Sequence, residues 1–394
     1  MEFKIMDTDF NIRYIVDMYE SCIWTLRVKE AGDFEIYTLV DDDFLKIVTE
    51  GIANGWYLFC EKFYDKENDR ANLMLIETNE IESDVENGAK MKVTGMDLKG
   101  LLTRRIVIGQ KTFKSGTEVN EVMKTLINEN IISPSDWTKS YQDHIYGDIT
   151  ITIPAADRRI DNFVIIEEPG TYEKLTGDLQ YNGEDLYSIF SDLSDKYKVC
   201  YDIKYNFTTG NFELFIFPYR DRTYDQNDLA PILFSPGFEN LKNSKYLESN
   251  SIEKTFGLII GEGDEFNAMY NIIGGGTGLA RREIGISGTD VSREDEERGQ
   301  QWGNKDYLNM LLEKGKSEMA KNVRVKTYEA EAETSRGYSY PEDFNIGDIV
   351  EIINEWGISS KVLVSEVILS ISKSSMNIVP TFSTINDSTE GGET

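Results

Sequence analysis

The chain has 394 residues, and its 70 aspartates and glutamates outnumber 41 lysines and arginines, for a formal charge of −29 at pH 7. This acidic balance argues against a protein that grips nucleic acid or docks on an anionic membrane, because both contacts need lysine and arginine. Aromatic residues make up 11% of the chain. That is too many for a disordered protein, so the composition predicts a folded, multi-domain one.

The first hundred residues have the pattern of short strands. Residues 90–94 alternate polar and apolar side chains, as a half-buried strand does. Residues 33–36 and 56–60 are further strand candidates, and turn sequences at 53–55 and 86–88 separate the candidates. About five or six short strands with little helix are typical of a small barrel or sandwich.

The pattern changes to mixed helix and strand from about 106 to 235. A helix is predicted after the capping-box match at 115–118, and a second amphipathic helix around 186–193. Alternating residues over 199–216, with a Thr-Thr-Gly turn in the middle, then predict a hairpin. We expect this segment to be an α/β insertion between two β-rich parts.

Strands resume from about residue 245 and are interrupted by one predicted helix near 303–322. The apolar stripe of this helix consists of Leu308, Leu311, Leu312 and Met319. C-terminal strands are predicted within 347–352, 361–371 and 376–382. The residues after 382 have few apolar side chains and predict a loose tail.

The cysteines and the N-terminus predict a reduced protein that is made in a cytoplasm. Cys22, Cys60 and Cys200 are odd in number and lack paired spacing, so we expect buried thiols and no disulfide framework. The first ten residues carry acidic side chains and no apolar core, unlike a secretory signal peptide. No apolar run approaches the roughly 18 residues of a membrane span, so no membrane insertion is expected.

Few residues are available for catalysis. His144 is the only histidine and has no nucleophile elbow beside it, so neither a Ser-His-Asp nor a Cys-His arrangement is expected. Zinc sites need several cysteines or histidines close together, and neither type clusters here. The sequence therefore predicts a protein that is not an enzyme, with no catalytic, metal-binding or cofactor-binding residue.

Two glycine-rich segments do not fit a ligand-binding motif. Residues 274–278 lack the Gly-Lys-Ser/Thr ending of a P-loop, and Leu279 stands where a G-x-G-x-x-G motif needs its last glycine. Residues 261–265 lack the alternating oxygen ligands and distal glutamate of an EF-hand. Both segments are expected to be loops between strands.

Paired carboxylates leave carbohydrate cleavage open, because a glycosidase needs only two acids a few ångströms apart. In so acidic a chain, however, runs such as 41–43 and 294–297 are expected to be solvated faces or loops. The tryptophans are scattered along the chain, which argues against a sugar-binding platform. The residues alone predict a β-rich, non-catalytic assembly or binding protein.

Four short parts of the chain carry a family resemblance. They are YESCIWT at 19–25 with EAGDFE at 30–35, DLKGLLTRR at 97–105, GEGD at 261–264 with GLARRE at 278–283, and GDIV at 347–350 with IVPTF at 378–382. In this order they resemble segments of the tailed-phage baseplate hub proteins, the Tal-like (tail-associated) family of siphophage tails. The matches span about residues 14 to 383.

The resemblance implies a structural role in a virion, at the tail tip or baseplate. Family members are homotrimers at the distal end of the tail tube, where two β-barrel domains per subunit alternate around the axis. The implied partners are the distal tail protein, the tail tube protein, the tape-measure protein and receptor-binding or fibre proteins. DNA would pass through the channel without specific binding, and no cofactor or catalytic residue is implied.

The expected fold is α+β and mainly β, with two tube-forming β-barrel hub domains, an inserted α/β domain and a helical insertion. We expect the first barrel over 1–105, the α/β domain over 106–235, the second barrel over 236–385 with its helix near 303–322, and a flexible tail over 386–394. Gly32 is expected to occupy a turn with positive φ. Trp24 and Phe34 are expected in the barrel core.

Two other functions stay open at this point. A tail-associated cell-wall hydrolase predicts paired acids in a deep cleft. A host carbohydrate- or receptor-binding module predicts an exposed aromatic platform on the middle domain.

Overall fold

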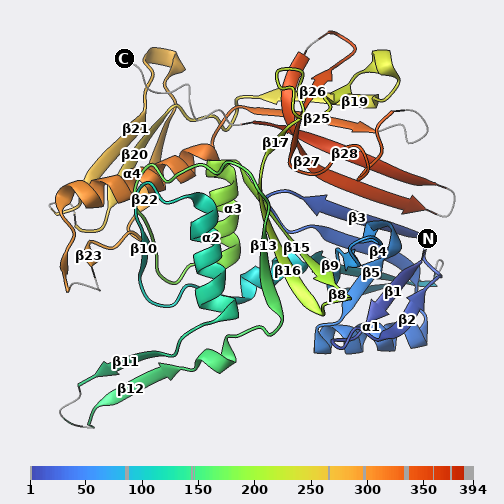
Figure 1. The fold of residues 1–394 in the computed structure, drawn as a ribbon, viewed down its shortest axis with the longest axis horizontal. Coiled ribbons are helices and arrows are strands. Elements are labelled where there is room, and N and C mark those ends of the chain that lie inside the picture. The colour runs from blue at the N-terminus through green and yellow to red at the C-terminus, as the bar shows by residue number, and fades with distance from the viewer. Residues whose placement is uncertain are drawn as a thin grey trace.

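The structure is mainly β and is built around one large sheet. It is a computed structural model that describes residues 2–84, 88–142, 145, 147–264, 267–295, 299–331, 337–357, 359–372 and 375–385. Strands account for 43% and helices for 21% of the described residues. Figure 1 shows the large sheet in blue and red on the right, and a mixed part with helices on the left. His144 and the predicted tail over 386–394 lie outside the described residues.

The large sheet takes its fourteen strands from both ends of the chain. The N-terminal members are β1 (Phe3–Met6), β2 (Ile12–Val16), β3 (Ser21–Arg27), β4 (Asp33–Leu39), β5 (Tyr57–Cys60), β8 (Met74–Asp84) and β9 (Gly88–Asp97). The later members are β17 (Arg220–Asp221), β18 (Leu233–Phe234), β19 (Lys242–Ser249), β25 (Val325–Glu331), β26 (Asp348–Ile353), β27 (Ser359–Ser372) and β28 (Met376–Thr384). The main path runs β19-β25-β28-β27-β3-β4-β9-β8-β5-β1-β2, and β26 joins β27, β17 and β18.

The antiparallel pair β3–β27 joins the two ends of the chain. Its register runs from Arg27 opposite Glu366 to Ser21 opposite Ser372. Among the described strands the main path ends at β19 and β2 and does not return to its start. A closed barrel is therefore not formed by these strands, because the two expected β-rich parts share one open sheet.

Trp24 and Phe34 lie in the core of this sheet, as the sequence predicts. Both are fully buried and stand opposite each other on β3 and β4, with ring centroids 6.3 Å apart. Val364 and Phe382, from the C-terminal strands, belong to the same apolar core. The two ends of the chain thus bury one common core, and apolar burial stabilises their joint.

The N-terminal part contains a helix that the strand pattern does not predict. Helix α1 (Asp42–Asn54) begins after Asp41, whose carboxylate accepts a hydrogen bond from the Phe44 N–H at 2.9 Å. It ends at Gly55, where φ is 68°. The acidic run at 41–43, expected to be a solvated face or loop, is the cap and first turn of α1, where carboxylates complement the helix dipole.

The middle part combines two helices with a five-stranded sheet of order β13-β16-β15-β7-β6. Its elements are β6 (Tyr64–Asp65), β7 (Arg70–Ala71), α2 (Val119–Ile127), β13 (Phe163–Glu167), α3 (Leu186–Tyr197), β15 (Val199–Asn206) and β16 (Asn211–Pro218). The predicted hairpin is confirmed as β15 and β16, and the second predicted helix as α3. Two strands, β6 and β7, come from the first hundred residues, so this sheet is not built from the middle segment alone.

The predicted capping box does not form at the start of α2. The residue before the helix is Glu118, whose side chain makes no capping hydrogen bond. The Ser115 N–H instead donates to the Asp178 carboxylate at 2.8 Å. The segment is therefore tied to a neighbouring loop, and the helix begins only at Val119.

A smaller sheet of order β21-β20-β22 is covered by the long helix α4. The bounds are β20 (Phe256–Gly261), β21 (Tyr270–Gly274), β22 (Glu283–Gly288) and α4 (Asn304–Ala320). The predicted helix near 303–322 is thus confirmed. The described residues of both glycine-rich segments connect these strands, as expected.

The apolar face of α4 differs in part from the predicted stripe. Tyr307, Met310 and Leu311 are buried against the small sheet. Leu308, Leu312 and Met319 stay partly exposed. The buried face of α4 is therefore formed by Tyr307, Met310 and Leu311, and the helix also packs on α3 of the middle part.

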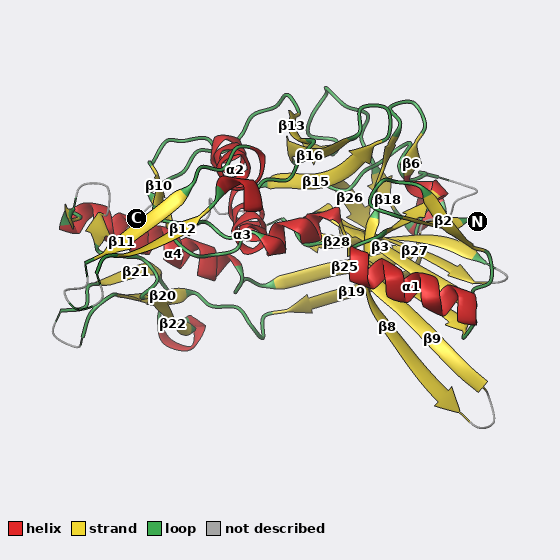
Figure 2. Ribbon diagram, turned by 90° about the horizontal axis from the view of Figure 1, so that it is seen from below, coloured by secondary structure: helices red, strands yellow, loops and turns green. Residues whose placement is uncertain are grey.

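Two hairpins extend from the body. The arm consists of β11 (Trp137–Tyr141) and β12 (Ile149–Ile153) and runs to the lower left of Figure 1. Figure 2 shows β8 and β9 running out past α1.

The remaining elements are short. They are η1 (Glu61–Phe63), η2 (Leu98–Arg104), β10 (Lys111–Phe113), η3 (Asn128–Ile132), η4 (Ala155–Asp157), β14 (Leu179–Tyr181), η5 (Pro236–Phe238), η6 (Gly278–Ala280), β23 (Glu294–Asp295) and β24 (Gln300–Gln301). In the described part of the chain, no helix has the length and apolar character of a membrane span.

Gly32 is needed for a close approach of two backbone segments and not for a positive φ. Its backbone lies outside the left-handed region, so that expectation is wrong. A Cβ on Gly32 would lie 2.2 Å from the carbonyl oxygen of Thr25 and 2.9 Å from the Asp97 carboxylate. The turn between β3 and β4 therefore accepts only glycine without moving one of these groups.

Replacing Gly32 by alanine should lower the free energy of unfolding by about 3 kcal/mol, because the added methyl group must displace backbone. The matched control is Gly285→Ala, whose Cβ would meet nothing within 4 Å. We expect the control to change stability by less than about 0.5 kcal/mol. Urea unfolding of both variants measures the difference, and equal midpoints would contradict the steric explanation.

Candidate functional site

The cysteines considered for catalysis lie in the core, and His144 lies outside the described residues. The three cysteines are fully buried, and none of them is in a disulfide. Burial raises the pKa of the Cys60 thiol to about 11 and also raises the pKa of the Cys22 and Cys200 thiols, so these side chains are inert. The described residues contain no group of three or more His, Cys, Asp or Glu side chains that could hold a metal ion.

The tryptophans do not form a binding platform in the described part of the chain. Trp24, Trp56 and Trp302 are buried, whereas Trp356 is 69% exposed at the turn between β26 and β27. Of the acidic run at 294–297, Asp295 is buried in the short strand β23, and its last two residues lie outside the described residues.

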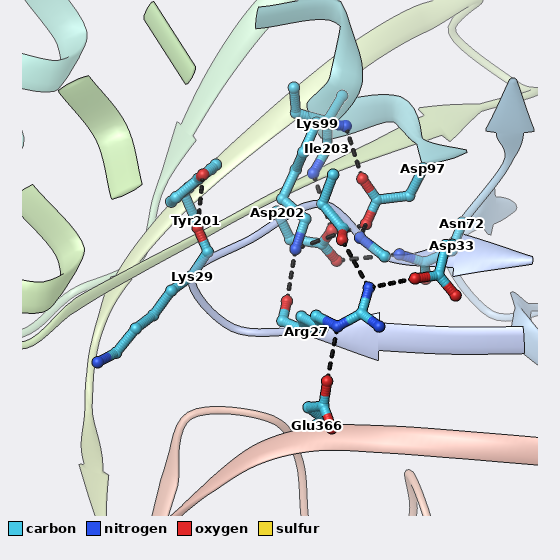
Figure 3. A network of polar contacts seen from close by, with 12 residues as sticks. Arg27, Lys29, Asp33, Asn72, Asp97, Lys99, Tyr201, Asp202, Ile203 and Glu366 are labelled. Carbon is cyan, nitrogen blue, oxygen red and sulfur yellow. Dashed lines mark hydrogen bonds and ion pairs between the residues drawn. The ribbon is translucent and has the colours of Figure 1, made fainter. Parts of the chain in front are cut away.

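The most elaborate polar site is a junction where three parts of the chain meet, namely the N-terminal strands, the middle part and the C-terminal strands (Figure 3). It lies around the turn between β3 and β4. We call this set the junction, and its members are Arg27, Lys29, Gly32, Asp33, Asp97, Lys99, Tyr201 and Glu366.

Asp97 is the buried centre of the junction. It is the last residue of β9, its side chain is 2% exposed, and it accepts hydrogen bonds from the Lys99 N–H at 3.0 Å and the Gly32 N–H at 2.7 Å. The Lys99 ammonium lies 3.5 Å from the carboxylate and donates to the Arg27 carbonyl oxygen. Burial raises the pKa of Asp97 to about 6, although Lys99 acts in the opposite direction.

Arg27 links the two ends of the chain at the same place. Its Nε donates to Glu366 on β27 at 2.6 Å, and its Nη1 donates to Asp33 on β4 at 2.6 Å. All three side chains are partly buried. Such charge-assisted hydrogen bonds are stronger than neutral ones, so they fix the β3–β27 register at this end.

The middle part binds the same turn from the other side. The Tyr201 hydroxyl on β15 donates to the Lys29 carbonyl oxygen at 2.8 Å, and the Ala31 N–H donates to the Tyr187 hydroxyl on α3 at 3.0 Å. Lys29 also pairs with Asp195 on α3. The β3–β4 turn is therefore held by side chains from all three parts.

A polar cleft of about 240 Å³ opens beside the junction, between β3 and the sheet of the middle part. Charges of both signs line it. Arg70 pairs with Glu213 at 2.5 Å, and Arg220 pairs with Glu168 at 2.6 Å. These two arginines are thus paired with carboxylates, and the cleft is a polar seam between two sheets.

A second buried ionic cluster attaches α4 to the middle part. Glu313 on α4 accepts hydrogen bonds from Lys196 and Tyr197 on α3, from Thr176 and from Lys316. Burial alone would raise the pKa of Glu313, but the attraction of Lys196 and the hydrogen bonds lower it, so the carboxylate stays ionised. A Cβ on Gly177 would lie 2.6 Å from the Glu313 Cγ, so a glycine is also required at this contact.

Three of the four segments that carry the family resemblance lie at contacts between the parts of the chain. The first supplies Gly32, the second supplies Asp97 and Lys99, and the last supplies Gly347 with Asp348. Asp348 is fully buried, and a Cβ on Gly347 would lie 2.8 Å from the Cys200 sulfur in the middle part. The sequence identifies these motifs, but nothing in their spacing shows that they meet.

Comparison with known proteins agrees with this architecture. The chain matches, over residues 2–382, the family described as Siphovirus ReqiPepy6 Gp37-like protein. It belongs to this family of siphovirus tail proteins, and the predicted resemblance to baseplate hub proteins of phage tails is confirmed. Among curated proteins, no sequence matches the chain.

Two solved structures share the fold over nearly the whole chain. The 43 kDa tail protein of prophage MuSo2 from Shewanella oneidensis has a TM-score of 0.52 and 14% identity, covering 97% of this chain and 98% of that one. The tail protein from Neisseria meningitidis MC58 has a TM-score of 0.51 and 10% identity, covering 97% and 96%. At such identities the likeness concerns the fold.

Asp97 should give the fold a distinct pH dependence. Its pKa is 3.8 without burial and about 6 in the folded protein, so between pH 4 and 6 the folded state keeps a proton that the unfolded state has released. Wild-type stability should therefore fall as the pH rises through this window, by on the order of 2 kcal/mol relative to Asp97→Asn.

Urea unfolding at pH 4, 5, 6 and 7 measures this effect. Asp161→Asn, which removes an exposed carboxylate, controls for the loss of one negative charge. A stability difference between wild type and Asp97→Asn that stays constant from pH 4 to 6 would rule out a buried, protonated Asp97.

Proposed function

We propose that the chain is a structural baseplate hub at the distal end of a phage tail tube. As a homotrimer it continues or closes the DNA channel and anchors distal tail and host-recognition components. The match to a siphovirus tail protein family over residues 2–382 carries this proposal. The junction supports it physically, because a hub must hold its parts in fixed positions.

The open large sheet supports a ring of subunits. Among the described strands its main path ends at β2 and β19. Free edge strands invite pairing with other chains, and neighbours in a ring can cover them. We propose that the two tube-forming barrels, over 1–105 and 236–385, are completed against neighbouring copies, with the α/β domain over 106–235 outside them.

The proposed partners are the distal tail protein, the tail tube protein, the tape-measure protein and receptor-binding or fibre proteins. DNA passes through the channel without specific binding. The charge of −29 per chain fits this role, because acidic surfaces repel DNA phosphates within a Debye length of about 8–10 Å. The proposed location is the tail tip or baseplate of the virion, after synthesis in the host cytoplasm.

We propose that the chain has no enzymatic activity. Among the acids that line the polar cleft, Glu168 pairs with Arg220 and Asp202 lies 3.7 Å from Lys204, whereas a glycosidase needs two carboxyl groups placed about a sugar bond. The cell-wall hydrolase and the carbohydrate- or receptor-binding module remain the alternatives.

The assembly is tested by native mass spectrometry or light scattering of the purified chain at tens of micromolar. We expect three times the mass of one chain, because the proposed ring places neighbouring copies against the sheet edges at β2 and β19. A strictly monomeric mass would contradict the homotrimer.

The absence of enzymatic activity is tested with peptidoglycan embedded in a gel and with a peptide substrate. We expect no clearing and no cleavage, with a known cell-wall hydrolase as the positive control. Clearing by the pure protein that a single Asp or Glu substitution abolishes would establish the hydrolase instead.

A further inference from the structure

The arm has one polar and one apolar face. On the polar face, hydroxyl groups bond across the strands, Thr138 with Thr152 at 3.3 Å and Ser140 with Thr150 at 3.0 Å. The opposite face consists of the cross-strand pairs Trp137–Ile153, Lys139–Ile151 and Tyr141–Ile149. We call this second set the arm face. The polar face can therefore stay in contact with water, whereas the apolar face can pack against a protein surface.

The arm face is exposed in the single chain. Tyr141, Ile149 and Ile151 are each about half exposed, at 50%, 49% and 48%. A two-stranded hairpin without a third strand is marginally stable in water. Grouped apolar side chains on such a ribbon indicate an interaction surface.

The small sheet carries a second exposed apolar surface. The cross-strand pairs Leu258–Ile272 and Ile260–Tyr270 lie on its outer side, and each of the four side chains is between 36% and 58% exposed. We call these four residues the sheet face. The opposite side of the same strands, with Ile259, is buried beneath α4.

We propose that the arm face of one copy of this chain packs on the sheet face of a neighbouring copy. This inference rests on the homotrimer of the proposed function. A head-to-tail ring contact requires that one chain carry both complementary surfaces, and this chain carries two of similar construction. Each is a pair of antiparallel strands with alternate apolar residues, which suits face-to-face packing of sheets.

The position of Lys139 argues against contact between the arms themselves. It stands in the middle row of the arm face, so stacking two arm faces would bring like charges together. The sheet face has an acid beside it. Exposed Glu262 follows Ile260 by two positions, and its carboxylate accepts a main-chain hydrogen bond from Arg293 at 3.1 Å. Charge complementarity therefore favours the sheet face over a second arm.

The size of the arm face also favours a second copy. Two five-residue strands measure about 17 by 10 Å, so the contact buries roughly 340 Å² over both partners. A stable independent interface buries about 1,200–2,000 Å². One such contact is too small to hold a separate protein. It is adequate for a neighbour that the rest of the ring already holds in place.

Disulfide trapping tests the contact in the full-length protein. Chains carrying Ile151→Cys and chains carrying Ile272→Cys, with tags of different size, are co-expressed and mildly oxidised. Because the native cysteines are buried and each chain has one new thiol, a cross-link reports contact between copies. We expect a cross-linked pair with one chain of each kind, at least tenfold above the control pair of Thr150→Cys and Ile272→Cys. Thr150 lies on the polar face of the same strand.

The other outcomes overturn the inference in distinguishable ways. Cross-links between two Ile151→Cys chains would mean that arms meet each other. A trimeric native mass without the expected cross-link would place the arm elsewhere and leave the proposed hub intact. A monomeric native mass would remove both the contact and the trimer.

Discussion

The burial of one carboxylate, that of Asp97, constrains how the three parts of the chain meet. A buried charge is costly unless hydrogen bonds and an opposite charge compensate it. Here the compensating groups are the Gly32 N–H and the Lys99 N–H and ammonium. The β3–β4 turn must therefore lie directly against the end of β9, and this approach leaves no space for a side chain at Gly32.

The same turn carries the contacts that reach the rest of the molecule. Once it is fixed, Arg27 stands opposite Glu366 on β27, and the Lys29 carbonyl oxygen faces the Tyr201 hydroxyl. The Glu313 carboxylate is likewise buried among compensating groups, and its contacts join α3 to α4. In both places, removing one charged partner would leave another buried and unpaired, which makes the relative positions of the parts specific.

Buried charged pairs and exposed apolar rows have different roles in this structure. Charged pairs lie inside, where they join parts of one chain, as at Arg27 and Glu313. Exposed apolar rows lie outside, on the arm and on the small sheet. Exposed apolar rows of this kind suit the contact between copies that we propose.

The sequence by itself determined the features that depend on local periodicity. Helices α3 and α4, the hairpin of β15 and β16, the burial of Trp24 and Phe34 and the loops at the glycine-rich segments all follow from spacing within short windows. The family motifs can also be recognised in the sequence, although the contacts that they make cannot. Tertiary structure alone decided the β3–β27 joint, the failure of the capping box at Ser115 and the need for glycine at position 32. These depend on partners far away in the chain, as in the contact between Arg27 and Glu366, which are 339 positions apart. No local pattern records such a partner, because the energy that selects it arises only when both segments are buried together.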